Sequence, residues 1–248
     1  MDRPEYESMY ELEDIHWWFV GRRNLALTLI EQWITFPPIT RILDVGCGTG
    51  GNLEALAKYG EVHGLDINPI AVDFARKRPL PQLTQSSGMS LPYPDNSFDL
   101  VTIFDVLYHQ WIVNDDTAIE ELYRVLCPGG WLLLTDSALP ILWSSHDQVY
   151  YARQRYTLGV MGEKLRRIGF NLKVSSYANM LLLPIFLLVR LTMGILPAAG
   201  DIDRQGIFPT WLNWILTQVR TLEAYWLRKG RSLPVGSSLV CLAQKPTG

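Results

Sequence analysis

Cysteine is scarce in this chain, and runs of basic residues are missing. The 248 residues contain three cysteines, Cys47, Cys127 and Cys241, which lie far apart and form no CxxC motif. This spacing fits neither a disulfide framework nor a zinc site, so a reducing compartment is expected. The 25 acidic and 22 basic residues give a net charge of −3 and no basic cluster that could neutralise nucleic-acid phosphates. Nucleic acid is therefore not expected as a partner.

The sequence also lacks the two patterns that direct proteins to or through a membrane. Its first residues, MDRPEYESMY, are acidic and aromatic, whereas a secretory signal is basic and then apolar. The most apolar stretch, residues 180–189, contains Pro184 and ends at Arg190, well short of the roughly 20 residues that span a bilayer. We therefore expect a cytoplasmic protein without a transmembrane helix.

Short apolar runs alternate with helical patterns from residue 41 onwards. Strand patterns lie at RILDV, EVHGLD, FDLVTIF and WLLLTDS, and two more are expected at residues 171–176 and at SSLVCLAQK. This alternation predicts an α/β fold with a mostly parallel sheet and helices on both faces. Residues 1–40 and 177–236 do not fit the alternation. Both are candidates to cover the carboxyl edge of the sheet, where ligands bind in such folds.

A glycine-rich turn follows the first predicted strand. Gly46, Gly48, Gly50 and Gly51 satisfy GxGxxG as well as GxGxG, which is a weak signal by itself. Asp44 is more informative, because a carboxylate at that position would repel the pyrophosphate of NAD or FAD. S-adenosylmethionine carries an ammonium group instead, and Asp66 at the end of the next strand is placed to accept hydrogen bonds from its ribose. The alternative is that both acids are ordinary turn residues.

The ordered motifs resemble those of the class I S-adenosylmethionine-dependent methyltransferases. The resemblance covers residues 41–136, in LDVGCGTG, GLDINP, LPYPDNSFDLV, DVLYH and RVLCPGGWLLL. It implies a Rossmann-like seven-stranded sheet that is parallel except for an antiparallel last strand. The chain then divides into a helical N-terminal cover (1–40), a core (41–176), an apolar lid insert (177–236) and the last strand (237–248).

The resemblance also assigns cofactor contacts residue by residue. Asp44 and the glycine turn, including Cys47, would surround the methionine part, Asp66 would bind the ribose and Ile67 would face the adenine. Further expected cofactor contacts are Ser87, Gly88, Met89 and Phe104. Relatives often carry an Asp where this chain has Ser87, so here a hydroxyl would receive the adenine amino group without a charge.

The segment HWWFVGRR precedes the first strand. Many bacterial small-molecule methyltransferases carry a similar segment, which implies a cover in which Trp18 and Phe19 close over the cofactor. Arg22 or Arg23 would then meet an anionic group. The alternative is an amphipathic helix that only packs on the edge of the sheet.

Candidate catalytic residues follow the fourth strand. Asp105 faces the cofactor edge in this family, and His109 is suited to remove a proton from an attacking hydroxyl, although a packing role is an equal alternative. His146 is a third candidate. Expected substrate contacts are Tyr108, Arg153, Arg155 and Tyr156, where the arginines suit a carboxylate or phosphate. Asp105 and Asp136 lack a third ligand, so no metal is expected and activity should survive chelation.

The expected function is methyl transfer to an apolar or amphipathic small molecule, such as a metabolite, a quinone or a lipid-linked glycan. A non-methylating reaction on the same fold and a cofactor-binding module without turnover are the alternatives. The Trp-rich insert 177–236 has three readings: a lid with an acceptor pocket, which we favour, a homodimer contact, or a peripheral membrane surface.

Overall fold

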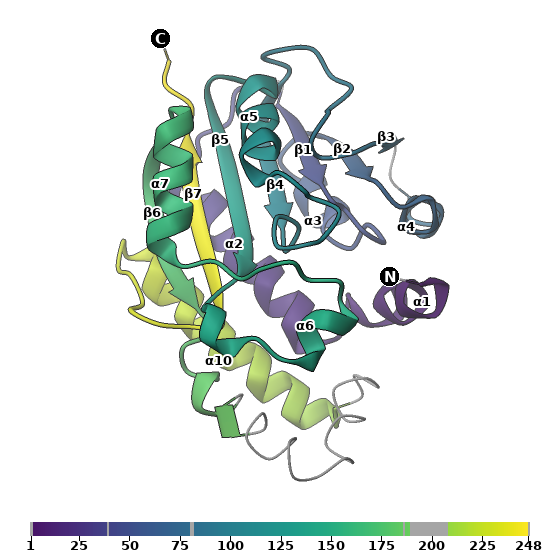
Figure 1. The fold of residues 1–248 in the computed structure, drawn as a ribbon, viewed down its shortest axis with the longest axis vertical. Helices are drawn as coiled ribbons and strands as arrows, with labels where there is room; N and C mark the ends of the chain where they lie inside the picture. Colours follow the sequence, from purple (N-terminus) through teal and green to yellow (C-terminus); the bar gives the residue numbers. More distant parts are fainter. Residues whose placement is uncertain (1, 39, 80–81, 186, 189–207, 248) are drawn as a thin grey trace.

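The computed structural model describes residues 2–38, 40–79, 82–185, 187–188 and 208–247 (Figure 1). Within these residues a single sheet has the strand order β3-β2-β1-β4-β5-β7-β6. Neighbouring strands are parallel except at β7, which is antiparallel to both β5 and β6. The predicted Rossmann-like sheet with an antiparallel last strand is confirmed.

One strand was missed by the sequence reading, and another is longer than predicted. The strands are β1 (Arg41–Val45), β2 (Glu61–Asp66), β3 (Gln82–Gln85), β4 (Phe98–Phe104), β5 (Leu126–Ser137), β6 (Asn171–Ala178) and β7 (Ser238–Gln244). The missed strand is β3, a short edge strand whose sequence QLTQ has a single large apolar residue. The longer strand is β5, which begins at Leu126. Leu126 pairs with Phe98 of β4, and the register between the two strands shifts before the next pair, Leu100 and Trp131. The PGG turn is therefore part of β5.

Several of the helices begin or end at residues that satisfy free backbone groups. They are α1 (Arg3–Leu12), α2 (Trp17–Trp33), α3 (Leu53–Ala57), α4 (Pro69–Ala75), α5 (Asp115–Val125), η1 (Pro140–Leu142), α6 (Ser145–Val149), α7 (Leu158–Ile168) and α10 (Thr210–Arg228). The side chain of Asn68 accepts from the Ile70 N–H before α4, and Thr157 caps α7 in the same way. Gly169, with φ 117°, ends α7 in the left-handed conformation.

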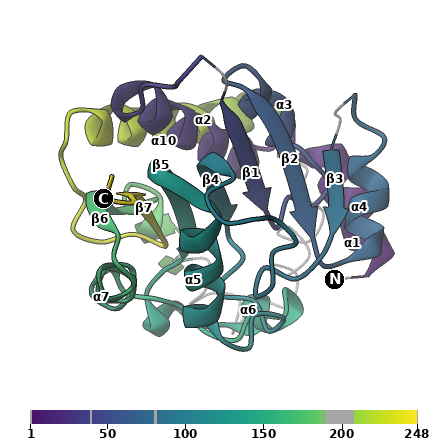
Figure 2. The same cartoon turned by 90° about the horizontal axis from the view of Figure 1, so that it is seen from above.

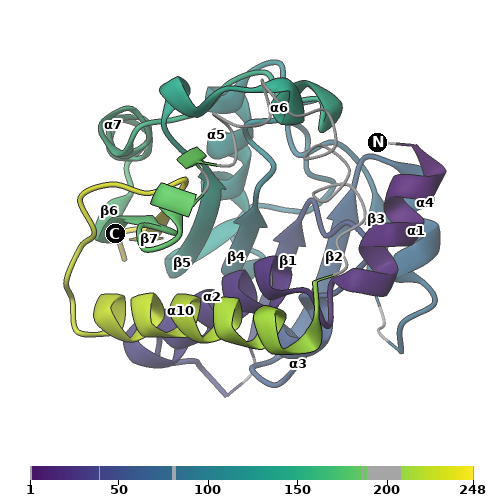
Figure 3. The ribbon, with the colours of Figure 1, turned by 90° about the horizontal axis from the view of Figure 1, so that it is seen from below.

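Helices cover both faces of the sheet (Figure 2). One apolar core joins the sheet to α5 and α7, and a second joins its other face to α2, α3 and α10. The α2 and α10 helices lie side by side and run in the same direction (Figure 3). Gly21 permits their close approach, since a Cβ there would lie 2.5 Å from Cδ of Arg220.

None of the described helices is both long and apolar enough to cross a membrane. The predicted apolar stretch 180–189 and the rest of the insert lie partly outside the described residues, because residues 186 and 189–207 are among those not described.

Candidate cofactor and active site

Asp44 lies near the carboxyl end of β1 and is almost completely buried. Its Oδ1 accepts a hydrogen bond from Thr102 Oγ1 at 2.6 Å, whereas its buried Oδ2 has no partner among the described residues. Burial raises the pKa of Asp44 to about 7, against the Thr102 hydrogen bond and the nearby Arg22 cation. A buried carboxylate oxygen without a donor is costly. This position therefore fits a ligand that brings an ammonium group.

Asp66 and the glycine turn lie beside Asp44. The carboxylate of Asp66 accepts from the N–H of Gly48 at 3.0 Å and from the N–H of Asn68 at 2.8 Å. Burial raises its pKa, and these backbone donors oppose the rise. Each carboxylate oxygen has a second lone pair, so Asp66 has acceptor capacity for the hydroxyls of a ribose.

The predicted adenine contacts come from the segments that follow β2 and β3. Ile67 is 42% exposed and Gly88 is buried, while Ser87 Oγ accepts from the Met89 N–H at 3.2 Å. Cys47, in the glycine turn, is buried, and burial raises the pKa of its thiol well above the usual value. Its sulfur is therefore kept protonated and packs against its neighbours.

A contact that the sequence did not predict holds the N-terminal segment over the glycine turn. Glu13, directly after α1, accepts from Thr49 Oγ1 at 2.6 Å and from the Gly51 N–H at 3.0 Å. It also pairs with Arg78 at 2.6 Å, and both side chains are less than 10% exposed, at 5% and 9%. Burial raises the pKa of Glu13, and the Thr49 and Arg78 contacts lower it. We call these residues the Glu13 clasp.

The HWWF segment begins α2 and faces the carboxyl end of β4. Nη1 of Arg22 pairs with Oδ2 of Asp105 at 2.5 Å, and the guanidinium lies 5.7 Å from the centre of the Phe104 ring. Nε of Arg22 is buried without a partner among the described residues. Trp18 and Arg22 line a cavity of about 10 Å³, which has room for about one water molecule.

Helix α10 also holds the cover segment in place through polar contacts. Asn213 accepts from the Trp17 N–H at 2.7 Å, and Arg220 donates to the Trp18 carbonyl at 3.2 Å. Burial lowers the pKa of Arg220 to about 10, although the charge of Glu223 opposes this. The insert was expected to turn an apolar pocket toward the site. In the described part of it, the side chains that contact the cover include Asn213, Arg220 and the ring of Phe208, which lies 5.6 Å from that of His16.

His109 stacks against two aromatic rings. Its ring centre lies 6.0 Å from that of Trp111 and 6.2 Å from that of Tyr151, with interplanar angles of 18° and 21°. Nδ1 of His109 is buried without a partner among the described residues. Burial lowers the pKa of His109 to about 4. The imidazole is therefore neutral at physiological pH.

Asp136 is the residue before the last of β5, lies close enough to Asp105 to feel its charge, and is fully buried. Its carboxylate accepts from the N–H of Ser137 at 2.7 Å and of Tyr108 at 3.2 Å. Burial and the charge of Asp105 raise the pKa of Asp136 well above its usual value. In the part of the chain that the structure describes, no group of three or more His, Cys, Asp or Glu side chains is arranged to hold a metal ion.

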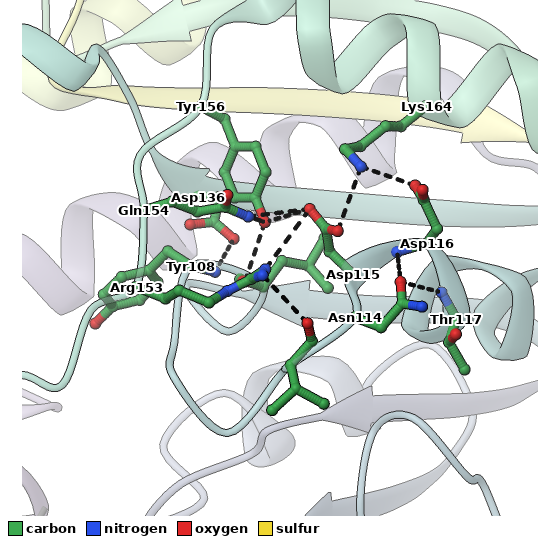
Figure 4. Close-up of polar contacts among 12 residues, drawn as sticks. Tyr108, Asn114, Asp115, Asp116, Thr117, Asp136, Arg153, Gln154, Tyr156 and Lys164 are labelled. Carbon is green, nitrogen blue, oxygen red and sulfur yellow. Dashed lines mark hydrogen bonds and ion pairs between the residues drawn. The ribbon is translucent and has the colours of Figure 1, made fainter.

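Two of the predicted substrate residues, Arg153 and Tyr156, lie beside the carboxylate of Asp115 (Figure 4). The hydroxyl of Tyr156 donates to Asp115 at 2.8 Å, and Arg153 lies 3.8 Å from the same carboxylate. Arg155 pairs with Asp147 at 2.7 Å, and both side chains are almost completely buried. Recognition of an anionic acceptor by these arginines stays a prediction, with these carboxylates as competing partners.

His146 lies on α6, between η1 and α7. Its side chain is outside the described part of the structure. The catalytic role suggested for it stays a prediction.

The central segment of the fold matches a known protein family. Residues 43–134 match the family model of the methyltransferase domain. The matched residues include Asp44, the glycine turn, Asp66 and Asp105.

Individual proteins match more of the chain. The demethylmenaquinone methyltransferase of Anoxybacillus flavithermus is 36% identical over 134 residues, which are 50% of this chain and 55% of that protein. The chain therefore spans about half the length of this relative. The solved structure of the [4+2]-cyclase SpnF is 26% identical, with a TM-score of 0.58, and the match covers 91% of this chain and 82% of that one.

A third protein shares the fold alone. It is phosphoethanolamine N-methyltransferase 2 of Haemonchus contortus, solved with phosphomonomethylethanolamine and S-adenosylhomocysteine. The two chains are 20% identical, with a TM-score of 0.57, and the match covers 90% of this chain and 53% of that one.

Proposed function

We propose that this protein is an S-adenosylmethionine-dependent methyltransferase that acts on an apolar or amphipathic small molecule. The observation that carries the proposal is Oδ2 of Asp44, which is buried without a donor beside Asp66 and the glycine turn. The methyltransferase-domain match over the same residues supports it. An acid at this position disfavours phosphorylated dinucleotides and favours a zwitterionic nucleoside.

Each residue of the site would bind a different part of such a cofactor. Asp44 would hold the ammonium group and Asp66 the ribose hydroxyls. Arg22, already paired with Asp105, would also bind the carboxylate of the cofactor's methionine part. The adenine would lie against Ile67, Ser87, Gly88 and Met89. When bound, S-adenosylmethionine supplies an electrophilic methyl group. No residue is required to bind a phosphate.

The protein's main contribution to the rate would be alignment of the acceptor and exclusion of water. Holding two reactants in line supplies about 7 to 11 kcal/mol of the barrier. The Glu13 clasp keeps α1 over the glycine turn, and the α10 contacts keep the start of α2 beside Asp105. Both covers would keep water away from a cofactor bound beside the glycine turn.

A quinol ring is the acceptor that we test first, because the Anoxybacillus relative is a demethylmenaquinone methyltransferase. The protein would be incubated with methyl-labelled S-adenosylmethionine and a short-chain demethylmenaquinol, and the label counted after organic extraction. We expect label in the quinol fraction. Absence of label there and in extracted metabolites of a cell lysate, with cofactor binding intact, would contradict methyl transfer to a small molecule.

A non-methylating reaction is the second candidate, since SpnF, a [4+2]-cyclase, shares 26% identity with this chain. The same incubation separates the two. A cyclase would convert a component of the extract into a product of equal mass without label. A binding module without turnover would change neither.

We further propose that His109 accepts the proton of a hydroxyl acceptor. His109→Phe keeps the ring stack but removes the nitrogens, and we expect kcat to fall about 100-fold. Because burial lowers the pKa of His109 to about 4, the basic form persists at every pH above that value. With saturating cofactor, kcat of the wild type should stay flat from neutral pH down to about pH 5. An unchanged kcat in the variant would assign His109 to packing.

A further inference from the structure

Helix α10 has two faces, and only one of them packs on the described part of the protein. Its buried residues are Arg220, Glu223, Ala224 and Leu227. The exposed large side chains of the helix, with their exposed fractions, are Trp211 (64%), Trp214 (62%), Ile215 (41%), Leu222 (63%), Tyr225 (54%) and Trp226 (45%). Their spacing of three, four and seven positions places them along one side of the helix.

This exposed stripe is an unusual surface for a protein in water. Single exposed apolar residues are common, but a contiguous row of large aromatic and aliphatic side chains marks an interaction site. Leu181, whose N–H donates to the inward-turned Glu223 at 2.8 Å, is a further exposed apolar residue near the helix, at 49%.

Cations gather at the C-terminal end of the stripe. Nζ of Lys229 lies 4.6 Å from the ring centre of Tyr225, and the guanidinium of Arg231 lies 4.3 Å from the ring of Trp226. Arg228 is also exposed. The single acid of α10 is Glu223, which is buried and turned toward the protein. The outer face therefore suits a partner that offers anionic groups to the cations and an apolar layer to the aromatic side chains.

We propose that the outer face of α10 docks on the surface of an anionic phospholipid bilayer. Trp and Tyr side chains favour the boundary between headgroups and acyl chains, and neighbouring Lys and Arg bind lipid phosphates. The helix would lie in the plane of the interface. A second copy of the chain fits this face less well. The outer face of α10 presents cations and no acid, so the same face of a second copy could not pair with them.

This docking would bring the candidate active site close to the bilayer. The inner face of α10 binds the Trp17 N–H and the Trp18 carbonyl of the cover segment. If the proposed function holds, an apolar acceptor dissolved in the bilayer would have a short path to the site. The docking itself depends only on the outer face.

Sedimentation with vesicles tests the proposal without cofactor or substrate. The full-length protein would be mixed with vesicles of phosphatidylcholine alone or of phosphatidylcholine and phosphatidylglycerol in equal parts. We expect the wild type to sediment with the anionic vesicles. The double variant Trp214→Gln, Trp226→Gln should partition at least about tenfold less, because two large apolar surfaces are lost.

Charge variants and a control complete the design. Lys229→Gln, Arg231→Gln should weaken partitioning about fivefold for each cation removed, and added salt should reduce this difference. Val160→Gln is the matched control, because Val160 is 46% exposed on α7, which packs on the other face of the sheet. It should sediment like the wild type, and circular dichroism should show every variant folded.

Two results would overturn the proposal. The first is a wild type that stays in the supernatant with anionic vesicles. The second is a wild-type dimer in sedimentation velocity that Trp214→Gln, Trp226→Gln converts to a monomer while vesicle binding is absent, which would make the stripe a contact between copies. Since the readout uses no cofactor, its failure is distinct from a failure of the methyltransferase assay.

Discussion

Asp44→Asn should weaken S-adenosylmethionine binding at least about 100-fold, the largest effect that we expect from one side chain in the site. Removing one partner of a buried charge pair typically costs about 3 to 5 kcal/mol. Asp116→Asn is the control, because Asp116 lies on α5 in an ion pair with Lys164 away from the glycine turn. Isothermal titration calorimetry measures both. Binding by Asp44→Asn within about threefold of the wild type would exclude the proposed ammonium contact.

The same substitution should stabilise the protein without cofactor. The folded-state pKa of Asp44 is raised to about 7 by burial, so the folded protein binds a proton more tightly than the unfolded chain does. The wild type therefore loses stability as pH rises from the unfolded-state value of about 4 to about 7. Asn does not ionise. The melting temperature of Asp44→Asn should exceed that of the wild type at pH 8, and the gap should narrow toward pH 4.

Gly46→Ala should unfold or strongly destabilise the protein. Gly46 has φ +72°, and a Cβ there would lie 2.3 Å from Cγ2 of Val106. Strain and overpacking together should cost about 3 kcal/mol or more, with loss of cofactor binding. Chemical denaturation measures the free energy of unfolding.

Gly230→Ala separates the cost of the left-handed backbone conformation from the cost of the contact with Val106. Gly230 also has φ +72°, but no atom of the described residues beyond its chain neighbours lies within 4 Å of its Cβ position. This variant should lose only about 1 to 2 kcal/mol, the cost of the left-handed conformation. Val106→Ala should partly rescue Gly46→Ala by removing the obstructing methyl groups. Equal losses at Gly46 and Gly230 would show that the contact with Val106 contributes nothing.

The sequence predicts those features that depend on local pattern. Alternating apolar runs and glycine turns identify the sheet, and its antiparallel last strand follows from the family resemblance and is confirmed. Strand β3 escaped detection because QLTQ has no alternation to distinguish an edge strand from a loop. The positions of Asp44 and Asp66 at the ends of β1 and β2 also follow from the pattern.

The remaining features arise from packing between distant segments. Glu13 meets Thr49 and Arg78, which are 36 and 65 positions away, and no local motif marks it. The insert was expected to form a lid with an apolar acceptor pocket, yet Trp211 and Trp214 are exposed, and Arg220 and Glu223 are turned inward. Which face of a mixed helix packs on the protein depends on its neighbour, here α2 at Gly21.

The central claim is that Asp44 selects a zwitterionic sulfur nucleoside over a phosphorylated dinucleotide. Calorimetric titration of the wild type tests it most directly, with S-adenosylmethionine, S-adenosylhomocysteine and NADH as the ligands. The account predicts saturable binding of both sulfur nucleosides and none of NADH. It also predicts that S-adenosylmethionine binding weakens by up to about tenfold per unit as pH falls below about 7, where Asp44 takes up its proton. Binding of NADH without binding of either sulfur nucleoside would contradict it.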